Sequence, residues 1–211
     1  MTRQIERLRP HQITEALREA SLIHMPLVTI EWHCHHLPVG LDALAAHGLC
    51  LRAAERTGGL VWPALCYGTG GDHGDFPWAA MMPDAAAIEA LLVVTLHRLR
   101  EMGVRRVVLF SGHFADSQPD VIDRIAAQWN LRHDQPGVLA LSVNRAAVPG
   151  LPPDHAGLSD LRRMSSDPDT AHRFDPHSPP WGIVGTAPGA RRRSSLRRWS
   201  IALSPGFNPW L

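Results

Sequence analysis

Short apolar runs alternate along the chain with longer segments whose apolar residues recur at helical spacing. The runs that we expect to form buried strands are 26–30, 60–65, 105–110 and 138–143. The segments that we expect to form helices are 11–20, 43–56, 84–102 and a last one that begins at Ser117 or Asp120 and ends at Trp129. Strands that alternate with helices predict an α/β fold, a three-layer αβα sandwich with a mostly parallel central sheet.

Two positions sharpen this assignment of elements. Asp84 is a favoured N-cap residue directly before the strongest helical pattern, and Gly103 follows that pattern where a C-terminal glycine belongs. Pro63 lies inside the second predicted strand and has no backbone N–H to donate. We therefore expect the second strand at an edge of the sheet or in its irregular end.

The pattern weakens beyond residue 149, where proline, glycine, serine and arginine dominate. We predict a single domain over residues 1–189, followed by an arginine-rich C-terminal tail over 190–211. The simpler interpretation of the basic run at 190–198 is a solvated or poorly ordered tail, and binding of an acidic partner is the alternative.

Composition removes several function classes. The net charge of +1 gives no general attraction to nucleic acid or to an anionic membrane. Every basic residue is arginine, which excludes a Schiff-base lysine and a phosphate-loop lysine. The 3 cysteines form no C-x-x-C pair, and neither an apolar leader nor a bilayer-length apolar run is present. These features favour a cytoplasmic protein without nucleic-acid or membrane partners.

The 13 histidines are the unusual feature, because several stand beside acidic residues after predicted strands. Such groups lie at 31–36, 72–73, 112–113 and 154–155. Glu31 and His33 are two residues apart, so on extended backbone they point the same way, and Asp42 opens the next helix. Since ligands bind beyond the carboxyl ends of parallel strands, this arrangement indicates a metal site. Taken singly, each group also fits a polar loop, a strand-ending turn or a helix start.

Four motifs in register resemble the creatininase (creatinine amidohydrolase) family. Residues 31–42 read E-W-H-C-H-H-L-P-V-G-L-D, where the family has E-x-H-G-x-H-L-P-x-x-T-D. Residues 67–79 read Y-G-T-G-G-D-H-G-D-F-P-W-A, where the family has Y-G-x-S-x-E-H-x-x-F-P-G-T. S-G-H-F-A-D at 111–116 stands for N-G-H-G-G-N, and H-A-G-L-S-D-L-R at 155–162 for H-A-G-x-x-E-T-S. The resemblance spans residues 26–160 and implies a creatininase-like fold.

The resemblance implies a site for two divalent metal ions. Glu31 and His113 would bind one ion, His33 and Asp160 the other, and Asp42 would bridge them. Family members use zinc or manganese, and the mixed nitrogen and oxygen ligands also suit iron. Two adjacent ions activate water and polarise an amide carbonyl, so the implied reaction is hydrolysis of a C–N bond.

The resemblance also implies residues for the reaction itself and an assembly. His155 matches a histidine that handles protons, and His36 and His73 match motif histidines near the pocket. Asp116 could supply a carboxylate to the second ion, in competition with Asp160, or act as a base if only one ion is present. Family subunits usually form hexamers, so we expect a homo-oligomer.

The chain departs from the family at a few informative positions. Cys34 and Trp78 replace motif glycines, Asp116 replaces an asparagine, and Asp160 is one methylene shorter than the family glutamate. We expect a dinuclear amidohydrolase acting on a small molecule or modified peptide in a biosynthetic pathway. The alternative is a catalytically impaired or single-metal relative that serves as a binding or assembly subunit.

Overall fold

The structure is a computed structural model that describes residues 2–33, 37–71, 76, 78–82 and 84–143. The chain divides into two compact units. The first comprises Met1–Trp32 and Val39–Arg145, and the second comprises His33–Pro38 and Ala146–Leu211. All helices and strands described below belong to the first unit. The expected domain boundary at residue 189 lies outside the described residues and stays a prediction.

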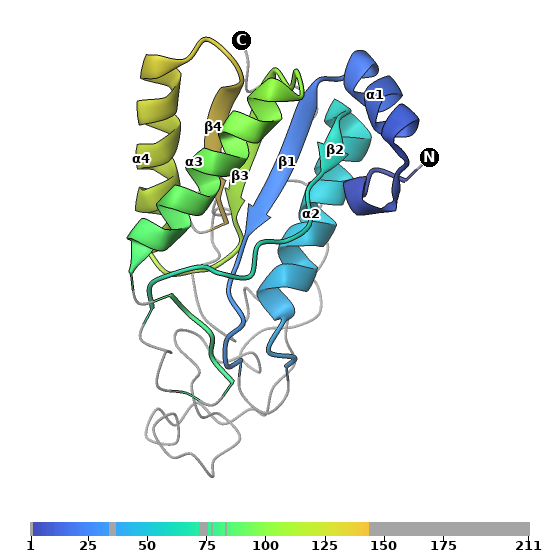
Figure 1. The fold of residues 1–211 in the computed structure, drawn as a ribbon. Helices are drawn as coiled ribbons and strands as arrows, with labels where there is room; N and C mark the ends of the chain where they lie inside the picture. Colours follow the sequence, from blue (N-terminus) through green and yellow to red (C-terminus); the bar gives the residue numbers. More distant parts are fainter. Residues whose placement is uncertain (1, 34–36, 72–75, 77, 83, 144–211) are drawn as a thin grey trace. The chain divides into compact units, whose positions relative to one another are not determined.

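Helices and strands alternate in the first unit as the sequence predicts (Figure 1). In chain order the elements are the 3-10 helix η1 (Ile5–Arg7), α1 (Pro10–Glu19), β1 (Leu22–Leu27), α2 (Leu41–Thr57), β2 (Leu60–Val61), α3 (Ala85–Glu101), β3 (Arg106–Ser111), α4 (Ser117–Arg132) and β4 (Gly137–Ser142). Asp84 caps α3 by accepting a 2.9 Å hydrogen bond from the backbone N–H of Ala86. The predicted N-cap is thus confirmed.

The four strands form one parallel sheet in the order β2-β1-β3-β4. Ile23 of β1 pairs with Leu60 on one side and with Val107 on the other, and Val107 pairs with Val138 of β4. β1 and β3 are therefore the central strands, and their carboxyl ends lie next to each other. β2 is an edge strand, as the position of Pro63 indicates.

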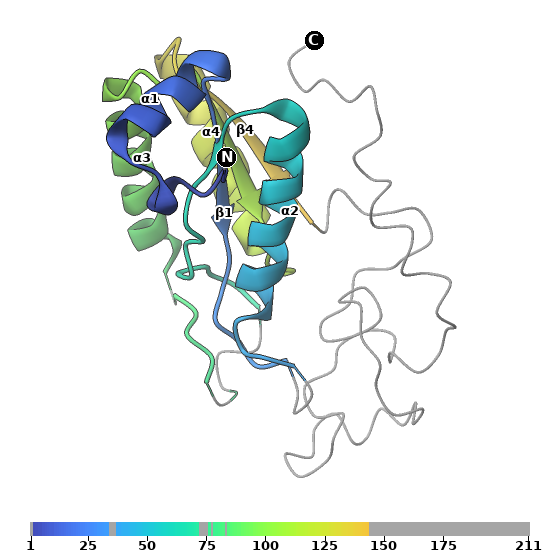
Figure 2. The same cartoon turned by 90° about the vertical axis from the view of Figure 1, so that its right-hand side faces the viewer.

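Helices cover both faces of the sheet, which confirms the expected three-layer fold. Figures 1 and 2 show α1, α3 and α4 on one face and α2 on the other. Alternate side chains of β1 account for the two interfaces. Ile23, Met25 and Leu27 belong to the large core that includes residues of α3 and α4. His24 points to the other face, where Thr57 Oγ1 at the end of α2 lies 3.2 Å from its Nε2.

β1 begins earlier and ends earlier than the predicted strand over 26–30. The polar His24 interrupts the apolar run and masks the strand in the sequence, yet in the fold it is 4% exposed and contacts Thr57 and the carbonyl of Gly58. After Leu27 the described chain forms an isolated bridge between Ile30 and Ala80 in place of a continuous ladder. β2 is also shorter than the predicted run over 60–65, because Pro63 cannot donate to a ladder.

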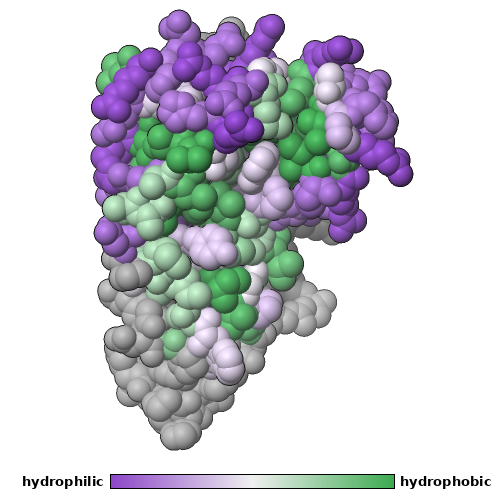
Figure 3. Space-filling model, in the orientation of Figure 1, coloured by the Kyte–Doolittle hydropathy of each residue, from purple (hydrophilic) through white to green (hydrophobic). Residues whose placement is uncertain are grey.

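Hydrophilic and hydrophobic side chains occupy different parts of the face seen in Figure 3. Figure 3 shows hydrophilic side chains over α1 and hydrophobic side chains between α1 and α3. α3 itself exposes the apolar Leu91 and Val94. Among the described residues, no helix combines the length and the apolar character that crossing a bilayer requires.

Candidate metal centre

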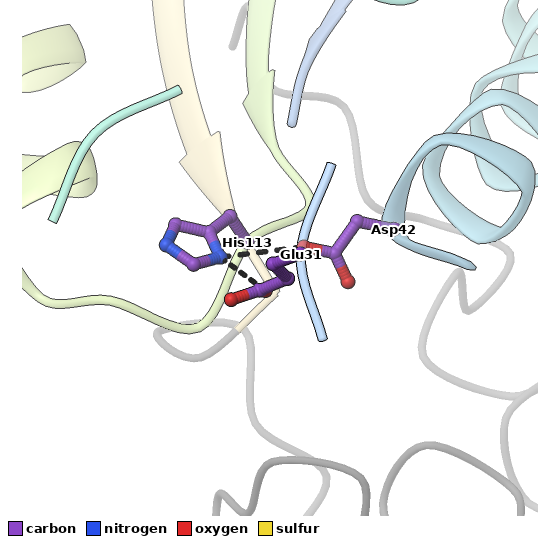
Figure 4. Close-up of side chains that lie close together, drawn as sticks. All are labelled: Glu31, Asp42 and His113. Carbon is purple, nitrogen blue, oxygen red and sulfur yellow. Dashed lines mark hydrogen bonds and ion pairs between the residues drawn. The ribbon is translucent and has the colours of Figure 1, made fainter. Parts of the chain in front are cut away.

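Three predicted ligands meet at the carboxyl edge of the sheet. Glu31 follows β1, His113 follows β3, and Asp42 is the second residue of α2, which begins at Leu41. Because β1 and β3 are adjacent and parallel, the segments that leave them lie next to each other. Figure 4 shows the three side chains converging from a β1 extension, the β3 end and the start of α2. We refer to Glu31, Asp42 and His113 as the acid–histidine cluster.

The distances within the acid–histidine cluster are short. His113 Nδ1 lies 2.7 Å from Glu31 Oε1 and 3.3 Å from Asp42 Oδ2. One ligand atom from each residue lies within 4.8 Å of the others. Within the described part of the chain, this is the one group of three histidine, cysteine or acidic residues that lie this close together. The exposed fractions are 1% for Glu31, 3% for Asp42 and 2% for His113. Two buried carboxyl groups around one imidazole are a donor set that suits a divalent cation.

The opposite nitrogen of the His113 ring has its own partner. Nε2 lies 2.9 Å from the carbonyl oxygen of Gly70. A carbonyl can only accept a hydrogen bond, so Nε2 carries a hydrogen and donates it. In the neutral ring this leaves the lone pair on Nδ1, directed at the two carboxylates. A carbonyl partner for the remote nitrogen is the usual way in which a protein orients a histidine toward a metal ion.

Thr29 supports the cluster from the segment that follows β1. Its Oγ1 donates to Asp42 Oδ2 at 3.2 Å and lies 3.1 Å from His113 Nδ1. Thr29 is fully buried, so its hydroxyl holds the Asp42 carboxylate in one orientation without access to water. The sequence did not single out Thr29, because a β-branched residue in an apolar run reads as an ordinary strand residue.

Burial and charge shift the cluster's pKa values in a consistent direction. Burial raises the pKa of Glu31, and its hydrogen bond to His113 only partly opposes this. Burial alone would lower the pKa of His113, but hydrogen bonds to Asp42 and Glu31 and their charges raise it to about 10. Without a cation, the imidazole therefore holds a proton between the carboxylates. A bound divalent ion would supply that positive charge in its place.

A glycine lets α2 approach the end of β3 closely. A Cβ at Gly112 would lie 2.5 Å from the Cβ of Ala46 and 3.0 Å from Val28 Cγ1. Any side chain there would force α2 away from the sheet, and Asp42 would move with it. The packing thus identifies α2 as the element whose close approach requires glycine at position 112.

Of the other predicted site residues, His33 and Asp116 lie within the described part of the chain. His33 is buried, with 1% of its surface exposed, and belongs to the second compact unit, whereas the cluster belongs to the first. Asp116 is exposed and stands at the N-cap position of α4. Four predicted residues lie outside the described residues, namely His36, His73, His155 and Asp160. The ligands of a second ion and the residues that move protons thus stay predictions.

Trp78 has an unusual backbone and an unusual exposure. Its φ is 63°, the one positive value for a non-glycine residue among the described positions. Its side chain is 77% exposed. Two residues on, Ala80 N–H donates to the carbonyl of Ile30 at 2.7 Å, next to Glu31. The strained tryptophan therefore lies on a segment tied to the backbone of the cluster.

Comparison with known protein sequences gives a family match and a relative. The model of the creatininase family, described as creatinine amidohydrolase, matches residues 6–178. A creatinine amidohydrolase from Pseudomonas putida is 34% identical over 103 residues, which cover 46% of this chain and 38% of the relative.

Solved structures share the fold. A structure described as manganese creatininase has a TM-score of 0.61 and 24% identity, and the match covers 71% of this chain and 62% of that one. A mutant creatininase of the zinc–zinc type has a TM-score of 0.63 and 21% identity, with 88% of this chain and 75% of that chain covered. This chain spans less than two thirds of the length of the Pseudomonas relative and of the manganese structure. Because the family model matches most of this chain, the chain belongs to the creatininase family.

Proposed function

We propose that this protein is a metal-dependent amidohydrolase that cleaves a C–N amide or cyclic-amide bond of a small molecule or modified peptide. The observation that carries the proposal is the buried acid–histidine cluster at the carboxyl edge of the sheet, in a chain of the creatininase family. A relative named creatinine amidohydrolase and a relative described with manganese support the reaction class and the cofactor class.

Each residue of the acid–histidine cluster would contribute a different ligand atom to a cation. Glu31 and Asp42 offer anionic oxygens, and His113 offers Nδ1 while its Nε2 donates to Gly70. Thr29 keeps the Asp42 carboxylate in place. A divalent ion bound there lowers the pKa of water and polarises a carbonyl oxygen, which are the two requirements of amide hydrolysis at neutral pH. The burial of all three residues strengthens every one of these charge interactions.

The proposal extends to a second ion held by His33 and Asp160, with Asp42 bridging both. The zinc–zinc description of one structural relative supports two ions. His155, His73 and Asp116 are the proposed residues for proton handling. We also propose that the protein is a cytoplasmic homo-oligomer, with six subunits as in the family, and that it acts in a biosynthetic pathway.

One observation favours the alternative of a binding or assembly subunit with at most one ion. Trp78 places a large exposed ring, at φ 63°, where the family motif has glycine. On this alternative, the ring occupies space that the family motif leaves free for a substrate. The alternative therefore predicts metal binding without turnover of amide substrates.

Metal content separates the two functions. Protein purified without chelator is analysed for elements per chain, then assayed with creatinine and a panel of small amides and formylated amines. About two zinc or manganese ions per chain with turnover supports the dinuclear hydrolase. One ion with no turnover supports the alternative. Protein that holds no ion and cannot be reloaded contradicts the proposed function.

A further inference from the structure

A buried glutamine lies behind the acid–histidine cluster. Gln118 is the second residue of α4, and its side chain has no exposed surface. Its Nε2 donates to the carbonyl of Leu27 at 3.0 Å and to Ser111 Oγ at 2.9 Å. Its Oε1 accepts from the backbone N–H of Thr69 at 3.0 Å. One amide thereby joins the last residue of β1, the last residue of β3 and the loop that contains Gly70.

Two of these bonds lead to His113. The Ser111 hydroxyl accepts from Gln118 and donates to the backbone carbonyl of His113 at 3.2 Å. Thr69 directly precedes Gly70, whose carbonyl accepts from His113 Nε2. Gln118 therefore restrains both the backbone that carries the imidazole and the carbonyl that orients its ring.

The absence of a side chain at Gly68 makes room for this amide. A Cβ at Gly68 would lie 2.1 Å from Gln118 Oε1 and 2.8 Å from Thr29 Cγ2. Burying an amide without hydrogen-bond partners is costly, so the three hydrogen bonds fix the position of the Gln118 amide and of its partners together.

We propose that Gln118 is a positioning residue for the metal centre, which fixes His113 with Nδ1 toward Glu31 and Asp42 and so sets metal affinity. The inference rests on the proposed function, because it requires a cation at the acid–histidine cluster. It goes beyond that function by assigning a role to a residue that no sequence motif singled out. Groups behind a metal ligand typically change affinity by roughly 10- to 100-fold when they are removed.

The same helix offers a matched control. Asn130 of α4 also bonds a strand through its side-chain amide, donating to the carbonyl of Val138 at 2.8 Å and accepting from its N–H at 2.9 Å. Val138 lies in β4, and neither bond touches a residue of the acid–histidine cluster. Gln118 and Asn130 thus lie on the same helix, and each bonds backbone groups through a side-chain amide. Of these two residues, Gln118 is the one whose hydrogen bonds lead to His113.

The test compares Gln118→Met with Asn130→Leu in the full-length chain. Each protein is titrated with Co²⁺, whose visible absorption reports coordination geometry, and with Zn²⁺ in competition with a chelator. We expect Gln118→Met to bind roughly 10- to 100-fold more weakly than the parent and to show altered Co²⁺ bands. We expect Asn130→Leu to unfold at a lower temperature while it keeps the parent's affinity and spectrum.

Ser111→Ala is the second variant and keeps the test decisive if Gln118→Met does not fold. It removes the hydroxyl between Gln118 and the carbonyl of His113, so we expect a smaller loss of affinity in the same direction. Parent-like affinity and spectrum in every folded variant of Gln118 and Ser111 would overturn the inference and leave the proposed function standing. Equal weakening by Asn130→Leu would also overturn it, because the effect would then follow stability. A parent protein that binds neither ion overturns the proposed function and this inference with it.

Discussion

The Nδ1 atom of His113 lies 2.7 Å from Oε1 of Glu31, although 82 positions separate the two residues in the chain. The pairing of β1 with β3 brings them together, since Leu27 and Ser111 are register partners at the carboxyl ends of these strands. Both groups are buried, so each depends on the other's charge or on a cation to remain ionised. This pair forms the centre of the candidate metal site.

Removal of the Asp42 carboxylate should remove the metal. We expect Asp42→Ala to lower metal content at both proposed positions and to abolish amide hydrolysis, because Asp42 contacts His113 and is the proposed bridging ligand. Elemental analysis per chain measures the effect. Asp134→Ala, which changes an exposed aspartate before β4, is the control. Unchanged metal content in Asp42→Ala would refute the bridging role.

The ring of His113 should have a defined tautomer once a cation is bound. We expect the hydrogen on Nε2, because that atom donates to the Gly70 carbonyl while Nδ1 faces the carboxylates. Nitrogen-15 NMR of zinc-loaded protein, with His113→Asn to assign the signal, distinguishes the two nitrogens. A hydrogen on Nδ1 would show that the ring is reversed in the loaded protein.

Stability should fall in mild acid through His24. Burial lowers the pKa of His24 from its ordinary value of 6.5, and its contact with the Gly58 carbonyl opposes this only in part. The unfolded state therefore binds more protons than the folded state as pH falls below about 6.5, and the folded state loses stability there. Above that pH this contribution is fully present.

Urea unfolding of the parent and of His24→Leu at pH 7.5 and pH 5.5 measures this effect. We expect the parent to lose more free energy of unfolding between the two pH values than the variant does. Equal losses in the two proteins would mean that His24 does not contribute to the acid sensitivity.

The backbone at Trp78 should prefer glycine to a β-branched residue. Its φ of 63° is costly for side chains branched at Cβ, and its ring is too exposed for burial to offset much. We expect Trp78→Gly to be more stable than Trp78→Val by about 1–2 kcal/mol. Thermal and urea unfolding compare the two variants, and equal stability would show that the segment relaxes to another conformation.

The local pattern of the chain determined most of the elements. Helical periodicity with Asp84 and Gly103 at its ends predicted α3, and the apolar run before Ser111 predicted β3, because these signals lie within a few neighbouring residues. Motif spacing also identified Glu31, Asp42 and His113, which the structure brings together. The proposed second-ion ligand Asp160 and the C-terminal tail lie outside the described part of the chain, so the second ion and the tail stay predictions.

Only the tertiary structure decided which residues hold the site residues in place and where β1 begins and ends. His24 hid the start of that strand, since its burial becomes acceptable only when the end of α2 supplies Thr57 and Gly58. The contacts of Thr29, the Gly70 carbonyl and Gln118 left no sequence signal. Their hydrogen bonds join segments far apart in the chain. Since every residue has a backbone carbonyl, the sequence cannot mark the one that His113 contacts. The sequence by itself determined where side chains of metal-binding type stand in the chain, and the packing of α2 and α4 on adjacent parallel strands decided which atoms face one another.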